Sequence, residues 1–491
     1  MDPRTPVIIG IAQLNNRSND SVEPISMMTN ASESALDDCA AAGGAGVVRD
    51  RVQAVRVVKG IWSYKDPGRL VADALGLPDA STANTPIGGN FAFDLTTDTA
   101  KRIQSGDLDV AIVCAAEAMR TRRRDRAQGL DSAKVAERDG AAPTDFYGVD
   151  RKLVSDREME VKVGATAVNF YGLVETAIRH RGQETVEDHR ARISAFWGRA
   201  SEIASNNPHA WNQEAASAAE ISETGPSNRP VAHPYPKLMT SNINVDQTVS
   251  FVMASAAAAE EMGVPRSQWV FPMAGVGASD HEFATNRWEI DASPAMRIAG
   301  GRALDLAGVS IDDCAHIDLY SCFPSAVQVA KRELGLAEER DFTITGGMTF
   351  AGGPLNCYSF LSLVRAVELL REQPETRAFI TGNGGYLSKH SFLVLSGQPP
   401  TEGFKSDVVQ DQVDALPARR DASGATTGVV EAYTVTYDRE GEFDTAILSC
   451  LTNDGGRFWV NDTNPDLCAD LVSNDRVGAT MTGTDNDVTL D

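Results

Sequence analysis

Residues 109–113 read Asp109-Val110-Ala111-Ile112-Val113, and residues 377–381 read Arg377-Ala378-Phe379-Ile380-Thr381. Both runs are short and largely apolar, which is typical of a strand that is buried on both faces of a sheet. Each run also closes a similar unit, because a short helix, a glycine turn and a longer helix are predicted before it. This repetition predicts an internal duplication of an α/β unit.

The two units share their glycine turns. The first unit spans residues 71–119 and carries Gly88-Gly89 before its longer helix. The second spans residues 329–386 and carries Gly346-Gly347 and Gly352-Gly353 in the same place. Its longer helix has one apolar face, made by Phe360, Leu363, Val364, Val367 and Leu370. Apolar strands that alternate with helices predict sheets covered by helices.

Two further stretches differ from the repeated units in composition and in their pattern of apolar residues. Residues 121–234 are polar and mostly helical in pattern, with an amphipathic helix predicted from Ile193 to Ala204. In residues 415–491, Tyr433, Val435 and Tyr437 alternate with threonines, which predicts a small antiparallel β-domain that resembles a barrel. We therefore predict a first half-core in residues 1–120 and 235–270, a helical loop domain in 121–234, a second half-core in 271–400 and an added β-domain in 415–491.

The charge is strongly acidic and unevenly distributed. The 491 residues carry a net charge of −23, and residues 401–491 alone contribute −12. A chain of this charge repels a phosphate backbone, so a nucleic-acid partner is not expected. A small anion that binds a local basic patch remains compatible with the sequence.

Several classes of protein and site are not expected. The N-terminus lacks the order of a secretory signal, and no apolar run approaches the length of a membrane span. The seven cysteines form no C-x-x-C pair and the seven histidines are scattered, so neither disulfides nor a metal site are predicted. We expect a cytoplasmic protein that needs no membrane, no metal and no covalently bound cofactor.

Several motifs occur together in an order that resembles the thiolase superfamily, in its sterol-carrier-protein-2 thiolase branch. They are the strand at residues 109–119, the segment from Tyr235 to Gln247, and the loops at 318–323, 352–354 and 382–385. With the added β-domain, the chain resembles the thiolase-like proteins of type 1. The resemblance implies a thiolase fold with duplicated βαβαβαββ halves and a helical loop domain.

The resemblance also implies that the family's catalytic residues are lost. The nucleophilic cysteine of the family falls at Gly89, its activating histidine at Gly353 and its second cysteine at Gly382. The asparagine or histidine of the remaining loop falls at Tyr320. Glycine has no side chain that attacks or transfers a proton. We therefore predict that the protein has no thiolase activity.

Three side chains are candidates for replacement chemistry. Tyr320 and Cys322 lie in a loop that faces the scissile bond in the family, and superfamily retro-aldolases are thought to use tyrosines there. His390 follows the glycine loop and is a candidate base. The alternatives are a small buried apolar residue for Cys322 and a hydrogen-bonded structural residue for His390.

Candidate ligand contacts come from one basic run and from two glycine turns. Arg122, Arg123 and Arg124 are expected to meet the phosphates of CoA, because the family's loop domain binds the nucleotide end. The peptide N–H groups near Gly352, Gly353, Gly384 and Gly385 are candidate donors to a carbonyl oxygen. The alternatives are a solvated arginine loop and glycines that only permit tight turns.

Three functions follow as hypotheses. The first is a protein of lipid metabolism that binds CoA or an acyl-CoA without thiolysis or Claisen condensation. The second is a retro-aldolase or other C–C bond enzyme that acts on acyl-CoA through Tyr320. The third is a scaffold whose acidic tail binds a partner. A monomer is favoured over a homodimer, because Pro86 removes a donor from the predicted edge strand.

Overall fold

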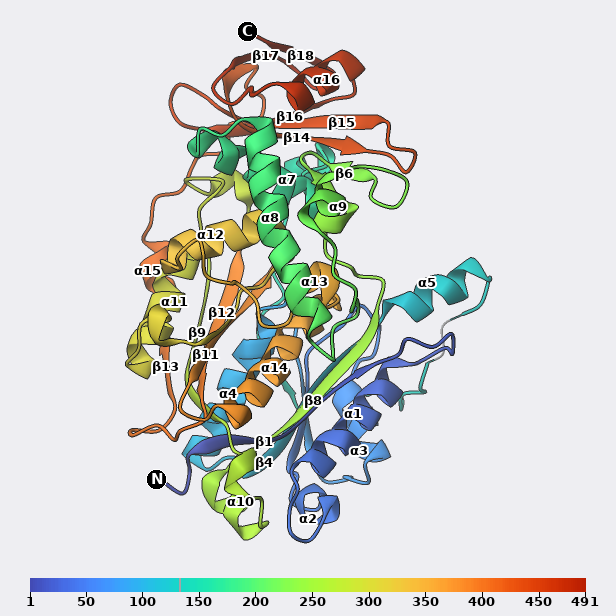
Figure 1. The fold of residues 1–491 in the computed structure, drawn as a ribbon, viewed down its shortest axis with the longest axis vertical. Coiled ribbons are helices and arrows are strands. Elements are labelled where there is room, and N and C mark those ends of the chain that lie inside the picture. The colour runs from blue at the N-terminus through green and yellow to red at the C-terminus, as the bar shows by residue number, and fades with distance from the viewer. Residues whose placement is uncertain (132–133) are drawn as a thin grey trace.

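The body of the molecule contains two mixed sheets (Figure 1). The computed structural model describes residues 1–131 and 134–491. The first sheet has the order β1 (Pro6–Asn15), β8 (Asp246–Ser255), β4 (Val110–Ala118), β2 (Ala54–Val57), β3 (Ser81–Asn84) and β5 (Asp145–Phe146). The second has the order β10 (His316–Asp318), β11 (Arg377–Gly384), β12 (Lys389–Ser396), β9 (Phe271–Ser279) and β13 (Lys405–Val408).

The two sheets have matching topologies. In the first, β1 and β8 are antiparallel, β8 and β4 are antiparallel, and β4 and β2 are parallel. In the second, β9 and β12, β12 and β11, and β11 and β10 repeat this order of directions. The predicted duplication is therefore confirmed, and both quoted sequences lie in corresponding strands, β4 and β11.

Helices form layers around and between the sheets. The two longer helices of the repeats, α4 (Phe91–Ser105) and α14 (Tyr358–Glu372), contact both sheets and lie between them. The outer face of the first sheet is covered by α1 (Pro24–Asp38) and α3 (Pro67–Ala74), with α2 (Ala45–Arg49) and α10 (Ala256–Glu261) nearby. The outer face of the second is covered by α11 (Pro294–Ala307), against which α12 (Pro324–Leu334) packs. This stack of layers is the fold that the sequence predicted.

The chain itself covers the edge of β3. β5 pairs with β3 in parallel, and the N–H of Tyr147 donates to the carbonyl oxygen of Asn84 at 2.9 Å. The β5–β3 ladder pairs Ala83 and Asn84, so it ends before Pro86, the residue that the sequence predicted as a weak point of this edge. An edge that is already paired does not template a second copy.

Between β4 and β8 the chain forms a helical region. Its longest helix, α8 (Val186–Ser205), confirms the predicted amphipathic helix, and α7 (Ala167–Arg181) packs between the body and the C-terminal sheet. Shorter helices complete this region and the second half, namely α5 (Met119–Ala127), α6 (Asp156–Glu160), α9 (Ala218–Ser222), α13 (Gly347–Phe350) and α15 (Gln410–Asp414).

The C-terminal domain is antiparallel, as predicted, but its sheet is not a closed barrel. The sheet has the order β16 (Arg457–Asp462), β15 (Phe443–Leu451), β14 (Thr427–Tyr437), β17 (Thr480–Thr484) and β18 (Asp487–Leu490). β17 pairs with only the first part of β14, and Thr436 near its other end pairs with Ala232 of β6 (Pro230–Ala232), which in turn pairs with β7 (Tyr235–Pro236). β14 is thus an inner strand whose second edge is shared by β17 and β6, and among the described residues the two outermost strands, β16 and β18, form no ladder with each other. One face is covered by α16 (Pro465–Ser473) and the other by α7.

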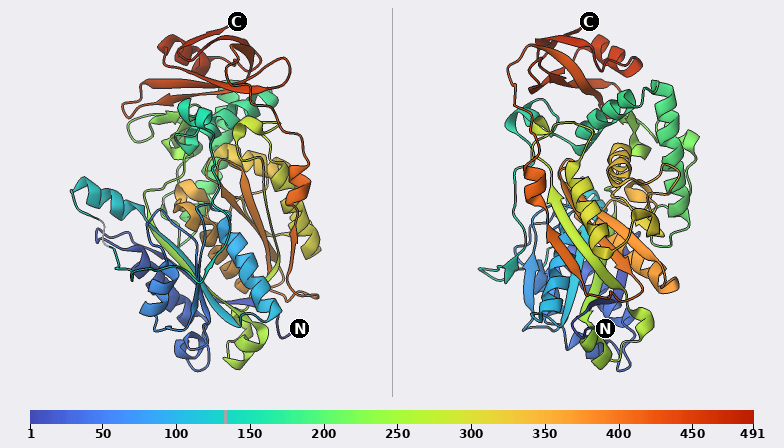
Figure 2. Two further views of the ribbon diagram at one scale, coloured as in Figure 1. Left: turned by 180° about the vertical axis from the view of Figure 1, so that it is seen from behind. Right: turned by 90° about the vertical axis from the view of Figure 1, so that its left-hand side faces the viewer.

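A buried arginine joins this domain to the body, at the end of the molecule opposite the N-terminus (Figure 2). Arg457 makes a two-pronged contact with the carboxylate of Glu431, at 2.6 and 2.7 Å. The same guanidinium donates to the backbone carbonyl oxygens of Ala284 and Thr285. Because the side chain of Arg457 is fully buried, these contacts replace its hydration.

We expect Arg457→Met to lower the free energy of unfolding by about 3–5 kcal/mol, because it leaves Glu431 and the carbonyl oxygens of Ala284, Thr285 and Arg287 without their buried partner. Urea unfolding followed by circular dichroism measures this loss. The matched control is Arg420→Met, which breaks an exposed ion pair with Asp454 and is expected to change stability by less than about 1 kcal/mol. Equal effects of the two variants would contradict the role given to Arg457.

Candidate functional site

Three of the four predicted catalytic positions lie in contact at the start of α4. Gly89 precedes this helix, Tyr320 follows β10 and Gly382 belongs to β11. The fourth, Gly353, precedes Leu355, whose carbonyl oxygen accepts the hydroxyl of Tyr320 at 3.3 Å. The loops therefore converge as the resemblance implied, at the carboxyl ends of β10 and β11.

The space at Gly89 is filled. A Cβ atom on Gly89 would lie 2.4 Å from the carbonyl oxygen of Asn383 and 2.9 Å from the hydroxyl oxygen of Tyr320. Such distances are shorter than any real contact of a Cβ atom, and the first is to backbone. The position to which the resemblance assigns the nucleophile is thus occupied by a neighbouring tyrosine and a neighbouring peptide.

The glycines of β11 permit the same close approach from the other side. A Cβ atom on Gly382 would lie 2.9 Å from the carbonyl oxygen of Gly89, and one on Gly384 would lie 2.3 Å from Oδ1 of Asn90. Gly385 has a φ of +65°, the left-handed conformation that favours glycine in a turn. These residues close two backbones onto each other, in agreement with the tight-turn alternative.

The turn at Gly352 and Gly353 is also closed. The N–H of Gly353 donates to the carbonyl oxygen of Asn242 at 2.9 Å, and a Cβ atom on Gly352 would lie 2.2 Å from Oε1 of Gln247. The N–H of Gly353 is therefore already used and does not serve a substrate oxygen in this conformation.

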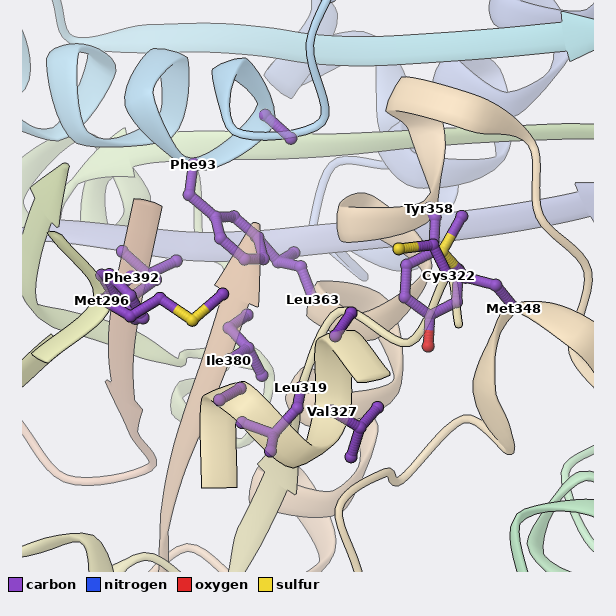
Figure 3. Packing of buried hydrophobic residues seen from close by; sticks show 14 of the residues in the cluster. Phe93, Met296, Leu319, Cys322, Val327, Met348, Tyr358, Leu363, Ile380 and Phe392 are labelled. Carbon is purple, nitrogen blue, oxygen red and sulfur yellow. The ribbon is translucent and has the colours of Figure 1, made fainter. Parts of the chain in front are cut away.

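Tyr320 and Cys322 are held in their neutral forms. Burial raises the pKa of Tyr320 well above its usual range, and the ring packs edge-on against Tyr358 with centroids 5.4 Å apart. Burial also raises the pKa of Cys322 to about 12. Figure 3 shows Cys322 with Tyr358 and Met348 in one cluster of buried side chains. A thiol in such surroundings is unreactive, which agrees with the alternative of a small buried apolar residue.

Tyr171 is a member of this cluster that the sequence reasoning missed. Its hydroxyl oxygen accepts hydrogen bonds from Nδ2 of Asn383 at 3.0 Å and from the N–H of Leu387 at 3.2 Å. It also neighbours the thiol of Cys322. Tyr171 comes from α7, where its position in an amphipathic pattern is indistinguishable from that of an ordinary core residue.

His390 lies on the other face of the second sheet. Its Nε2 atom is 3.1 Å from Oγ of Ser293, which caps α11, and 3.4 Å from Oδ2 of Asp280. The next residue, Ser391, points to α4 instead and donates to the carbonyl oxygen of Asn90. Because side chains alternate along a strand, His390 does not face Gly89, and we correct its assignment as a candidate base to a structural residue.

A cavity of about 700 Å³ lies beside the Gly89 loop. Its wall has an apolar part and a cationic part. The lining residues include Lys59, Ile61, Trp62, Ile87, Glu117, Met119, Arg122 and Lys134. Of the three predicted arginines, Arg122 lines this cavity, whereas Arg123 is exposed on α5 and Arg124 donates to Oγ of Ser21. The basic run is thus split between the cavity and the surface.

Glu117 is the buried acid of this cavity. Glu117 is 3% exposed, and its Oε1 atom accepts a hydrogen bond from the N–H of Ile61 at 2.7 Å. Burial raises the pKa of Glu117 to about 8. The group is therefore mostly protonated at neutral pH and is then able to donate a hydrogen bond.

In residues 1–131 and 134–491, no group of three or more His, Cys, Asp or Glu side chains is arranged to hold a metal ion. Within the same residues, no helix has both the length and the apolar character that crossing a bilayer requires.

Comparisons with known proteins bear on the fold and on the C-terminal domain. Residues 408–487 match the family model of the thiolase-like protein type 1 additional C-terminal domain. A monomeric SCP2-thiolase like protein type 1 from Mycobacterium smegmatis is 29% identical, with full coverage of both chains and a TM-score of 0.84. Among curated protein sequences, no match is found.

Two more distant likenesses concern the fold alone. The Ltp2-ChsH2(DUF35) aldolase is 17% identical over 80% of this chain and 98% of that one, with a TM-score of 0.60. The dimeric peroxisomal thiolase of Saccharomyces cerevisiae is 11% identical over 81% and 98% of the two chains, with a TM-score of 0.57.

We expect Gly89→Cys to destabilise the protein rather than to create a nucleophile, because the added atoms meet the Asn383 carbonyl. Overpacking of this kind lowers the free energy of unfolding by about 1–3 kcal/mol, measurable by urea unfolding. Gly301→Cys is the control, since a Cβ atom there meets no other atom within 4 Å. Thiolysis of acetoacetyl-CoA by Gly89→Cys above background would contradict the packing argument.

We expect Glu117→Gln to gain stability over the wild type as pH rises from 5 to 9. The raised pKa of Glu117 means that the folded state binds more protons than the unfolded state between pH 4.5 and about 8, so wild-type stability falls across this range. Glutamine keeps the acceptor for Ile61 and does not ionise, and one pKa unit is equivalent to about 1.4 kcal/mol. Urea unfolding at pH 5, 7 and 9 checks this, with the exposed Glu33→Gln as the control; parallel pH profiles of Glu117→Gln and wild type would refute it.

Proposed function

We propose that the chain is a thiolase-like protein of type 1, as the match of residues 408–487 and the 29% identical relative support, and that it binds CoA or an acyl-CoA without thiolysis or Claisen chemistry. The observation that carries the proposal is the filled space at Gly89, where Tyr320 and the Asn383 carbonyl leave no room for a nucleophile. A thioester that approaches this point meets no group that attacks it. Binding without cleavage is then the property that the fold retains.

The cavity beside the Gly89 loop supplies the groups that such a ligand needs. Arg122, Lys59 and Lys134 line it and provide positive charge for phosphates in an otherwise acidic chain. The indole of Trp62 offers an aromatic surface, and Nε1 is fixed by a 3.0 Å bond to the carbonyl oxygen of Ala116. The protonated Glu117 faces the same space as a donor for a carbonyl oxygen. Phosphate, ring and carbonyl groups occur together in CoA thioesters.

The retro-aldolase hypothesis rests on Tyr320 as an acid or base. Its hydroxyl donates to the Leu355 carbonyl, and its raised pKa opposes loss of the proton near neutral pH. In addition, Tyr320 lines neither the Arg122 cavity nor the other cavity that contacts the start of α4. These observations favour binding over C–C cleavage. The scaffold hypothesis remains the alternative in which the acidic C-terminal domain recruits a partner and the cavity binds nothing.

We also propose that the protein is a monomer. β5 pairs with Ala83 and Asn84 of β3 and so covers part of this sheet edge, which supports the proposal from this chain itself. Further support comes from the Mycobacterium smegmatis relative, which is described as monomeric.

We expect isothermal titration calorimetry to detect binding of CoA and acetyl-CoA, with Arg122→Ala weakening the affinity about fivefold or more through loss of one phosphate contact. Arg126→Ala is the matched control, because Arg126 lies on α5, is exposed and does not line the cavity. Acetoacetyl-CoA is expected to remain uncleaved in the presence of CoA. Absence of measurable heat up to millimolar CoA would reject the proposal in favour of the scaffold.

A further inference from the structure

The helix α5 projects from the body of the molecule beside the Arg122 cavity (Figure 1 and Figure 2). Its sequence reads Met119-Arg120-Thr121-Arg122-Arg123-Arg124-Asp125-Arg126-Ala127, with five arginines and one acid. In a chain with a net charge of −23, this helix is a local reversal of the charge. The proposed function gives a role to only one of its arginines.

One side of α5 is anchored to the body. The N–H and the hydroxyl group of Thr121 both donate to the carboxylate of Asp246, at 2.9 and 2.8 Å. Asp125 is buried and accepts a hydrogen bond from the hydroxyl group of Ser21 at 2.8 Å. Arg124 lies 3.6 Å from the same carboxylate. The acid of the helix therefore faces inward and is used there.

The side of α5 that faces away from the body carries three exposed arginines. At about 100° per residue, Arg122, Arg123 and Arg126 fall within an arc of about 100° that excludes the buried Thr121 and Asp125. Within residues 1–131 and 134–491, neither Arg123 nor Arg126 has a hydrogen-bond or ion-pair partner for its side chain. We call these three side chains the outer arginines.

Nearby acids do not neutralise the outer arginines. Asp20 and Asp131 are exposed in neighbouring segments, and in the described part of the chain neither forms an ion pair with α5. Glu23 accepts the backbone N–H groups at the start of α1, and Glu137 accepts those of residues 65 and 66. Glu117, which precedes the helix, is mostly protonated at neutral pH because burial raises its pKa to about 8. The outer arginines thus keep their positive charge.

The spacing of the outer arginines indicates the surface that they fit. Arg126 lies four residues after Arg122 and three after Arg123, so the guanidinium groups are neighbours on the helix surface. Carboxylates three or four residues apart on an acidic helix have the same spacing, and a guanidinium binds a carboxylate through two parallel hydrogen bonds. A bilayer is a poorer match, because a helix that lies on a membrane needs an apolar face and α5 has only Met119 and Ala127 at its ends.

We propose that the outer arginines dock an acidic surface of a partner protein, with carboxylates on Arg123 and Arg126. Arg122 extends the same arc into the wall of the cavity, so a docked partner lies beside the cavity. The site itself does not depend on CoA binding. One further step rests on the proposed function, namely that the partner supplies the thioester to the cavity or receives it from there.

Fluorescence anisotropy of a labelled poly-glutamate peptide with the full-length chain tests the docking site. We expect the peptide to bind in spite of the chain's net negative charge, and a poly-glutamine peptide of equal length not to bind. The double variant Arg123→Ala/Arg126→Ala is expected to weaken binding about fivefold or more. The matched control is Arg49→Ala/Arg439→Ala, which removes two other exposed arginines and changes the net charge equally.

The proposal is overturned if poly-glutamate does not bind, or if the two double variants have equal affinities for it. Tighter binding to phosphatidylglycerol vesicles or to duplex DNA than to poly-glutamate also overturns it. An equal loss of CoA affinity in Arg123→Ala/Arg126→Ala, measured by calorimetry, assigns these arginines to the CoA site instead and likewise overturns it. Absence of CoA binding in the wild type rejects the proposed function alone, because the peptide is tested without CoA.

Discussion

The two half-cores meet where the backbone before α4 touches the backbone of β11, with no side chain between them. The carbonyl oxygen of Gly89 accepts a hydrogen bond from the hydroxyl group of Ser359 at 2.9 Å. The carbonyl oxygen of Asn90 accepts one from the hydroxyl group of Ser391 at 2.7 Å. Hydroxyl groups of the second half thus satisfy backbone acceptors of the first. This contact sets the distance between the two sheets. It leaves no open space between the two backbones at the centre of the fold. The cavity lined by Arg122 lies beside this contact, and none of Gly89, Tyr320 and Gly382 lines it.

Both flanks of α4 combine a buried acid with nearby cations, in a chain whose overall charge is negative. Glu117 on one side and Asp94 on the other have pKa values raised by burial, so each carries less negative charge at neutral pH than its type suggests. The local potential therefore departs from the global one.

Sequence reasoning reached the duplication, the layered fold and α8, because these depend on apolar periodicity within single segments. It failed where a distant segment decides the outcome. Alternation in β14 predicts a strand but not that β6, about 200 residues earlier in the chain, pairs with its end. His390 was misplaced because one step along a strand reverses the face. Tyr171 was missed because a core aromatic and a site aromatic have the same pattern. The sequence identified Gly89 and Gly382 as the altered positions. Only the structure shows that neighbouring atoms already occupy the space that a side chain at either position needs.

The pairing of α7 with β14 has a consequence for the order in which the chain folds. Oγ1 of Thr176 donates to the carbonyl oxygen of Tyr433, across 257 residues of sequence. During synthesis, the helical region emerges long before the strand that covers it. α7 packs on α12 within the body, but the side of α7 that contacts β14 stays uncovered until the last fifth of the chain is made. The C-terminal domain thus completes the folding of a region that lies far earlier in the sequence. A chain that stops before β14 lacks the strand that covers one side of α7.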